Sequence, residues 1–248
     1  MVFHVLNGDA LKDQLSGIIR GELIVARECL IDGPVDGELL EHFFQQRAEF
    51  IEEAYGNDSG SYFDLVVPEF DKLLGIPNNT TINLWFEDDL FCQVNFWFIC
   101  HLLSQKKESF ETYLIRPIPN AKYGFGSMDT KQLKTALYKR VKLFQEDLEV
   151  IAELWNAYRS NDPRVLLESG NGLPQKFSFI LPAIHAQLDR LPKNGNPGRP
   201  EATLIQIMHD LQTTDFGPVF KEFSERENIY GFGDLQVRHM FDEILNQG

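Results

Sequence analysis

The sequence lacks features that mark several large classes of protein. Its three cysteines, Cys29, Cys92 and Cys100, form neither a CxxC pair nor an even disulfide set, so we expect free thiols in a reducing cytoplasm. The longest apolar stretch, residues 96–100, is far too short to cross a membrane. Met1 leads straight into an apolar strand pattern without a signal sequence. These absences predict a cytoplasmic protein with no membrane association.

Motifs that identify common enzyme classes are also missing. There is no Walker loop, no GxGxxG, no GxSxG and no zinc-ligand spacing. Two Gly-Phe-Gly segments, at residues 124–126 and 231–233, look glycine-rich, but neither has the strand-then-helix context of a phosphate-binding loop. We interpret both segments as tight turns. No motif therefore names a cofactor.

Positive charge is scarce, with 23 Lys and Arg against 37 Asp and Glu and a formal net charge of −14. The first 120 residues carry 8 cations against 20 carboxylates, the next 80 carry 12 against 8, and the last 48 carry 3 against 9. Nucleic-acid binding needs a basic footprint, which only the middle segment could supply. There we interpret Lys134, Lys139, Arg140 and Lys142 as the solvated face of a helix. Nucleic acid is therefore an unlikely partner.

The first 120 residues alternate between strand and helix patterns. The predicted strands are residues 2–7, 22–28, 81–86 and 112–115, and the predicted helices are residues 10–20, 37–55, 62–74 and 90–104. This order is typical of an α/β domain with a mostly parallel sheet. We assign that domain to residues 1–120.

The second half has no comparable strand signal, and we predict an all-helical C-terminal domain over residues 121–248. The predicted helices are residues 130–160, 162–168, 177–191, 201–212, 216–226 and 234–246. The last three could form a winged-helix-like unit. The final helix, however, offers only Arg238 and His239 against three carboxylates, which favours helix packing or protein interaction over DNA binding.

Four short segments occur together in a fixed order: residues 4–9 (HVLNGD), 32–34 (DGP), 84–86 (LWF) and 230–234 (YGFGD). In this combination the chain resembles the bacterial domain-of-unknown-function family 1835, followed by the helical half that usually accompanies it. The resemblance covers nearly the whole chain. It implies an α/β half and a helical half, and it brings no established activity and no catalytic residues.

Polar residues follow the predicted strands. Because the carboxyl ends of parallel strands meet at one edge of a sheet, we expect a ligand cleft there. The candidate ligand-binding residues are Asn7, Gly8, Asp9, Glu28, Asp32, Asp89, Gln93, Asn95 and Arg116. Gly8 would let a ligand approach the backbone, and Asp9 could accept a hydroxyl group or hold a cation. Alternatively, Asp9 and Asp89 only cap helices, and Gln93 and Asn95 only bond a neighbouring loop.

The candidate catalytic residues are His4, Asp9 and Glu28. His4 lies inside the first predicted strand, where a histidine is either a general base that titrates near neutral pH or a hydrogen-bonded core residue. The acidic surroundings of Cys92 should raise the pKa of its thiol, which argues against a nucleophilic cysteine.

A metal site is not expected. Asp9, Glu28, Asp88 and Asp89 are hard oxygen ligands of the kind that Mg²⁺ takes beside a substrate phosphate. However, no metal-binding spacing is present, and acidic runs at helix starts are commonly just solvated. Mg²⁺ is thus only a secondary hypothesis.

Three classes of function remain open. The first is a protein or enzyme that binds a nucleotide or other phosphorylated metabolite in the strand-end cleft. The second is a non-catalytic regulatory protein whose helical half docks a protein partner. The third is a nucleic-acid-associated factor that acts through its C-terminal helices, which the charge pattern disfavours.

Overall fold

The computed structural model describes residues 1–37, 39–56, 59–107, 109–119, 121–122 and 124–247. Within them lies one five-stranded sheet in the order β2-β1-β3-β4-β5. Its strands are β1 (Val2–Leu6), β2 (Glu22–Val25), β3 (Thr80–Trp85), β4 (Phe110–Ile115) and β5 (Val141–Leu143). β1 to β4 are parallel and β5 is antiparallel to β4. The prediction of a mostly parallel α/β half and a mostly helical C-terminal region is confirmed.

Apolar residues alternate between the two faces of the sheet. Leu6, Trp85 and Ile115 belong to a smaller core with helices α1 and α6, whereas Val5 and Leu84 belong to the main core. Successive side chains of a strand point to opposite faces, and here both faces are buried. The strand sequences are therefore nearly continuous apolar runs. The sheet is thus covered on both faces.

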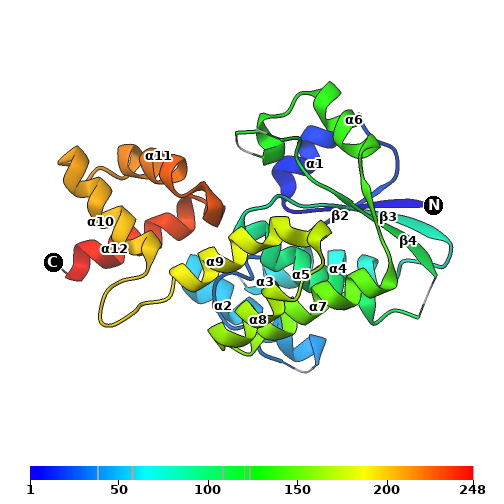
Figure 1. Cartoon of the computed structure of the whole chain (residues 1–248), viewed down its shortest axis with the longest axis horizontal. Coiled ribbons are helices and arrows are strands. Elements are labelled where there is room, and N and C mark those ends of the chain that lie inside the picture. The colour runs from blue at the N-terminus through cyan, green and yellow to red at the C-terminus, as the bar shows by residue number, and fades with distance from the viewer. Residues whose placement is uncertain (38, 57–58, 108, 120, 123, 248) are drawn as a thin grey trace.

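Helices form a layer on each face of the sheet (Figure 1). The smaller layer holds α1 (Asp9–Leu15) and α6 (Thr130–Tyr138). The larger layer is built from α2 (Leu40–Tyr55), α3 (Ser59–Leu65), α4 (Val67–Leu74), α5 (Leu90–Ser104), α7 (Gln145–Arg159), α8 (Pro163–Asn171), η2 (Gln175–Ile180) and α9 (Leu181–Asp189). α5 is buried around most of its circumference, which explains why its sequence is apolar without a clear period.

The last helices form a unit with its own core. α10 (Arg199–Leu211), α11 (Phe216–Arg226), η3 (Asn228–Tyr230) and α12 (Asp234–Gln247) follow one another. Leu204, Ile207, Val219, Phe223, Val237 and Phe241 pack together between the helices. Figure 1 shows this three-helix unit beside the edge toward which the parallel strands run. Among its described residues there is no β-hairpin that would form a wing.

Several predicted helices differ from the structure in their extent; the helix expected over residues 10–20 ends at Leu15, and the one expected over residues 177–191 is divided into η2 and α9. The helix expected over residues 130–160 is interrupted by β5, because Val141–Leu143 pairs with β4 and the Phe144 N–H donates to the Asp147 carboxylate at 3.0 Å, which starts α7. The C-terminal half is therefore not all-helical. The helix expected over residues 62–74 is divided into α3 and α4, with Pro68 in the first turn of α4, where a missing N–H is tolerated.

The proposed domain boundary at residue 120 stays a prediction, although β5 and α7 lie after that boundary and complete the sheet and its larger helical layer. By contrast, α5, α11 and α12 agree with the predicted ranges to within one residue. No helix in the described part of the chain has both the length and the apolar content needed to cross a membrane.

Candidate functional site

The order of the strands creates a switch point between β1 and β3. From β1 the chain turns through α1 to β2 on one side, and β3 lies on the other side of β1 and leads through α5 to β4. The two connecting helices cover opposite faces of the sheet, so a crevice opens at the carboxyl ends of β1 and β3. Asn7 follows β1 there, and residues 87–89 follow β3.

Buried amides tie the strand ends to α5. The Asn95 Nδ2 donates to Asn7 Oδ1 and to the Glu28 carbonyl oxygen, both at 2.7 Å. The Asn7 Nδ2 lies 2.9 Å from Cys92 Sγ. The Gln93 Nε2 donates to the Glu87 carbonyl oxygen at 2.6 Å. Gln93 and Asn95 therefore hold the neighbouring loops, the second of their two predicted roles.

One pocket lies at the ends of β1 and β2; we call it the β1–β2 pocket. It has a volume of about 450 Å³. Its lining includes Asn7, Gly8, Asp9, Arg27, Glu28, Tyr55, Tyr62, Phe91, Leu235 and Gln236. Gly8 has a φ of +94°, and a β-carbon added there would have no heavy atom within 4 Å, so open space adjoins its backbone. Four of the nine predicted ligand-binding residues thus share one pocket.

Asp9 and Arg27 form a two-pronged ion pair at the mouth of this pocket. The Arg27 Nε and Nη2 donate to the two carboxylate oxygens at 2.7 and 2.8 Å, and its Nη1 donates to the Leu65 carbonyl oxygen at 2.8 Å. The hydrogen bonds from Arg27 lower the pKa of Asp9. Gly8, and not Asp9, is the N-cap of α1, so the capping alternative is wrong for Asp9.

Glu28 forms the floor of the pocket within a buried network. Arg47, with no exposed surface, donates from Nη2 to the Glu28 carboxylate at 3.0 Å, and the Tyr62 hydroxyl donates to the same carboxylate. Arg47 also donates to the carbonyl oxygens of Cys29, Asp32 and Pro34. Glu28 is thus fully engaged in fixing the loop after β2, which makes it a positioning group rather than a free acid or base.

Asp32 lies in a neighbouring pocket of about 330 Å³, beside Phe232 and His239. It accepts hydrogen bonds from the Tyr55 hydroxyl at 2.9 Å and from Arg190 at 3.0 Å. Tyr55 and Gln236 line both this pocket and the β1–β2 pocket. Asp32 is therefore separated from Asp9 by the side chains that divide the two spaces.

A larger cleft of about 860 Å³ lies at the ends of β3 and β4; we call it the β3–β4 cleft. It contains Asp89 and also Arg116, which binds the Asp88 carboxylate through two N–H groups and lies 3.6 Å from the centre of the Phe179 ring. Residues 231–236 separate it from the β1–β2 pocket, since 231 and 232 line the cleft and 235 and 236 line the pocket. The predicted single cleft is therefore divided by the C-terminal unit.

Both Gly-Phe-Gly segments lie against the acidic turn after β3. A β-carbon at Gly231 would overlap the Asp89 carboxylate, and one at Gly124 would overlap the Glu87 carboxylate. Both glycines have positive φ, as the turn interpretation requires. The sequence therefore indicated the turns, but nothing in it showed that both approach the same two carboxylates.

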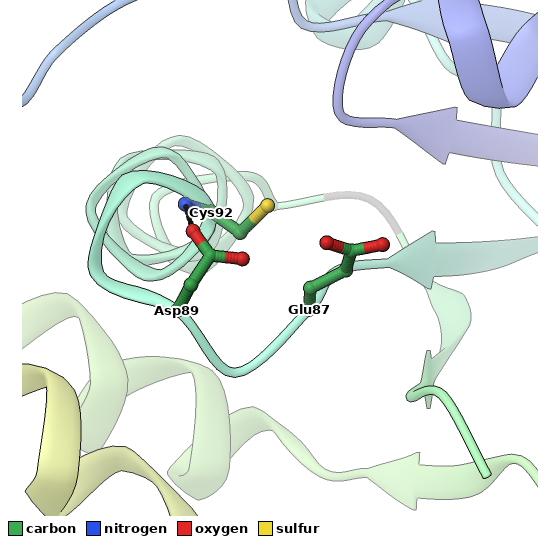
Figure 2. A group of neighbouring side chains, drawn as sticks. All are labelled: Glu87, Asp89 and Cys92. Atoms are coloured by element: carbon green, nitrogen blue, oxygen red, sulfur yellow. Dashed lines mark hydrogen bonds between the residues drawn. The ribbon is translucent and has the colours of Figure 1, made fainter. Parts of the chain in front are cut away.

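Glu87, Asp89 and Cys92 face one another at this point, as Figure 2 shows, with their potential ligand atoms within 4.8 Å of one another. Burial, reinforced by the charge of Asp89, raises the pKa of Glu87 to about 7, and burial also raises the pKa of Asp89. The pKa of Cys92 is raised by burial and then by Asp89, as predicted. Asp89 also caps α5 by accepting the Cys92 N–H at 2.9 Å, so for Asp89 the capping role is real.

The group can share a proton near neutral pH, and its two carboxylates and thiol are also a possible metal-ligand set. The four carboxylates considered for Mg²⁺ do not converge in this way. Asp9, Glu28 and Asp88 are each paired with a different arginine, so they form no joint set with Asp89. The predicted Mg²⁺ ligand set did not include Glu87, because only the tertiary fold brings the Gly124 backbone against the Glu87 carboxylate.

His4 lies in the core, away from the pockets. Its Nδ1 accepts a hydrogen bond from Trp85 Nε1 at 3.0 Å, so its Nε2 carries the proton and donates to the Arg20 carbonyl oxygen at 3.2 Å. Burial lowers the pKa of His4. Both ring nitrogens are thus occupied, which supports the core interpretation over a general base.

No known family model and no curated protein matches this chain. The resemblance to family 1835 therefore remains a prediction. The case for a function rests on the pockets at the carboxyl edge of the sheet and on the residues that line them.

Proposed function

We propose that this chain binds a nucleotide or other phosphorylated metabolite in the β1–β2 pocket. The observation that carries the proposal is the open backbone of Gly8 beside the Asp9–Arg27 pair, next to the switch point of the sheet. A glycine backbone with free space above it can approach a ligand more closely than any other residue.

The walls of the pocket suit a ligand with one polar end and one ring-shaped end. Arg27 is the sole lysine or arginine among the described residues that line it, and Leu65 holds its guanidinium in place. The side chain of Asp9 is half exposed, so it can rotate away and leave two N–H groups of Arg27 for a phosphate. Tyr55 and Phe91 offer ring surfaces on the pocket wall.

A thermal-shift screen tests the proposal. Nucleotides and sugar phosphates are compared with their dephosphorylated counterparts, each with and without Mg²⁺. A ligand at about a hundred times its Kd adds about 2.7 kcal/mol to the free energy of unfolding, which raises the Tm of a chain of this size by about 5–10 °C. We expect such a rise for a phosphorylated compound and a smaller one for its dephosphorylated form.

Substitutions assign the ligand to the pocket. Arg27→Gln should reduce the affinity for the phosphorylated compound at least tenfold. Arg164→Gln is the matched control, because Arg164 also forms an ion pair with an aspartate but lies outside the β1–β2 pocket. Equal affinities of the two variants would show that the ligand does not bind in the β1–β2 pocket.

If none of the compounds raises the Tm of the folded protein, the result would favour the second class of function, a regulatory protein with a protein partner. The C-terminal unit does not support the third class of function, a nucleic-acid-associated factor. In this unit Arg238 lies over the Phe216 ring at 3.5 Å, and His239 lies beside Glu243. These side chains are held within their own unit, while a DNA-reading helix presents its cations to the groove.

A further inference from the structure

The largest run of positive charge without a carboxylate lies on α6 and β5. From Thr130 to Gln145 the sequence has five Lys and Arg and no Asp or Glu, in a chain of net charge −14. Lys131 and Lys134 line a groove on α6 together with Tyr138 and two threonines. Within the described part of the chain, Lys131, Lys134 and Lys139 form no ion pair. The surface is therefore cationic and uncompensated.

Three large apolar side chains are exposed within the same stretch of sequence. The exposed fractions are 88% for Tyr138, 51% for Val141 and 56% for Phe144. We call the area of these three residues with Lys131, Lys134 and Lys139 the α6–β5 surface. Tyr138 lines the groove with Lys131 and Lys134, and Val141 lines the adjoining end of the β3–β4 cleft with Lys139, so each of these two apolar side chains lies beside a lysine.

The edge of the sheet lies within this surface. β5 is the last strand in the sheet order, so its outer side pairs with no other strand among the described residues. On its inner side, Lys142 donates to Glu111 at 2.6 Å and Arg140 lies over the Tyr113 ring, which fixes β5 to β4. Unpaired backbone groups at a sheet edge can receive another extended chain.

We propose that the α6–β5 surface receives an extended acidic segment of a partner protein, which lies along the outer edge of β5. The free lysines select carboxylates by charge, and Tyr138, Val141 and Phe144 contact the apolar side chains that alternate with them. A polypeptide is favoured over a nucleic acid or an anionic lipid because a strand edge forms hydrogen bonds with another backbone. This proposal does not depend on the β1–β2 pocket.

The probe is a fluorescein-labelled peptide of alternating Glu and Val, seven residues long, whose binding to the full chain is followed by fluorescence polarisation. Comparison probes are the same peptide with N-methylated backbone amides, a (dT)₁₂ oligonucleotide, and vesicles of phosphatidylserine and phosphatidylcholine. We expect saturable binding of the peptide, and at least tenfold weaker binding of the N-methylated form.

The variant Lys134→Glu/Lys139→Glu should weaken peptide binding at least tenfold. Lys193→Glu/Lys221→Glu makes the same change of charge on exposed lysines of the C-terminal segment and should weaken it less than twofold. The proposal is overturned by absence of saturable peptide binding, by equal binding of the N-methylated peptide, or by tighter binding of the oligonucleotide or the vesicles. In those cases the lysines serve to block the edge or to bind another anion.

Discussion

The backbone of Gly231 covers the Asp89 carboxylate so closely that a β-carbon at Gly231 would overlap Asp89 Oδ1. Gly231 belongs to the C-terminal unit, and Asp89 is the N-cap of α5, the most deeply buried helix. The contact therefore fixes the three-helix unit to the switch point of the sheet. Gly124 covers Glu87 in the same way, and the Phe125 N–H donates to the Glu87 carboxylate at 2.5 Å.

Gly231→Ala should therefore destabilise the protein. The φ of +64° is unfavourable for alanine, and the new methyl group forces the loop away from Asp89. We expect a loss of about 2 kcal/mol in the free energy of unfolding, measured with urea. Gly217→Ala is the control, because a β-carbon there meets nothing within 4 Å and its φ is ordinary. An equal loss in both variants would contradict the contact.

The raised pKa of Glu87 predicts a specific pH dependence of stability. Its pKa of about 7 in the folded chain exceeds the usual 4.5, so the folded state retains a proton that the unfolded state has lost between these pH values. Stability from Glu87 is then full below pH 4.5 and is lost as the pH rises through 7, by about 3 kcal/mol. His4 acts oppositely, because its lowered pKa removes stability as the pH falls below 6.5.

The two effects are separated by comparing Glu87→Gln with the parent chain. Glutamine keeps the shape and has no proton to lose, so the difference in unfolding free energy between variant and parent should change by about 3 kcal/mol from pH 5 to pH 8. The variant gains relative to the parent as the pH rises. A difference that stays constant over this range would show that Glu87 has an ordinary pKa.

Local signals predicted the elements that local chemistry determines. Asp89 before an apolar run predicts the start of α5 at Leu90, and Asp129 predicts the start of α6 at Thr130. The extended segment at Val141–Leu143 was hidden because its apolar residues also fit a helical period. Its strand conformation depends on pairing with β4, which is a tertiary contact.

The site was predictable in position but not in its connections. Strand ends placed Asn7, Asp9 and Glu28 at one edge of the sheet, as found. No local pattern indicates that Arg47, nineteen residues after Glu28, is its buried partner. Nor could the sequence show that residues 231–236 divide the edge into separate spaces, because that division depends on how the C-terminal unit docks.

Arg47→Met should be strongly destabilising, since it leaves the buried Glu28 carboxylate without its charge partner. We expect a loss of about 3–5 kcal/mol in the free energy of unfolding, measured by chemical denaturation. The double variant Glu28→Gln/Arg47→Met should recover part of this loss, because no uncompensated charge remains. Arg164→Met, on an exposed ion pair, should cost less than about 1 kcal/mol. A similar small cost for Arg47→Met would show that water reaches Glu28.

His4→Ala separates a core histidine from a general base. It removes the acceptor for Trp85 Nε1 and the donor to the Arg20 carbonyl oxygen, and it leaves a cavity in β1. We expect a loss of about 2–4 kcal/mol in the free energy of unfolding. The affinity for any compound found in the β1–β2 pocket should stay within twofold, because His4 does not line that pocket. Undiminished stability together with lost binding would instead assign His4 to the site.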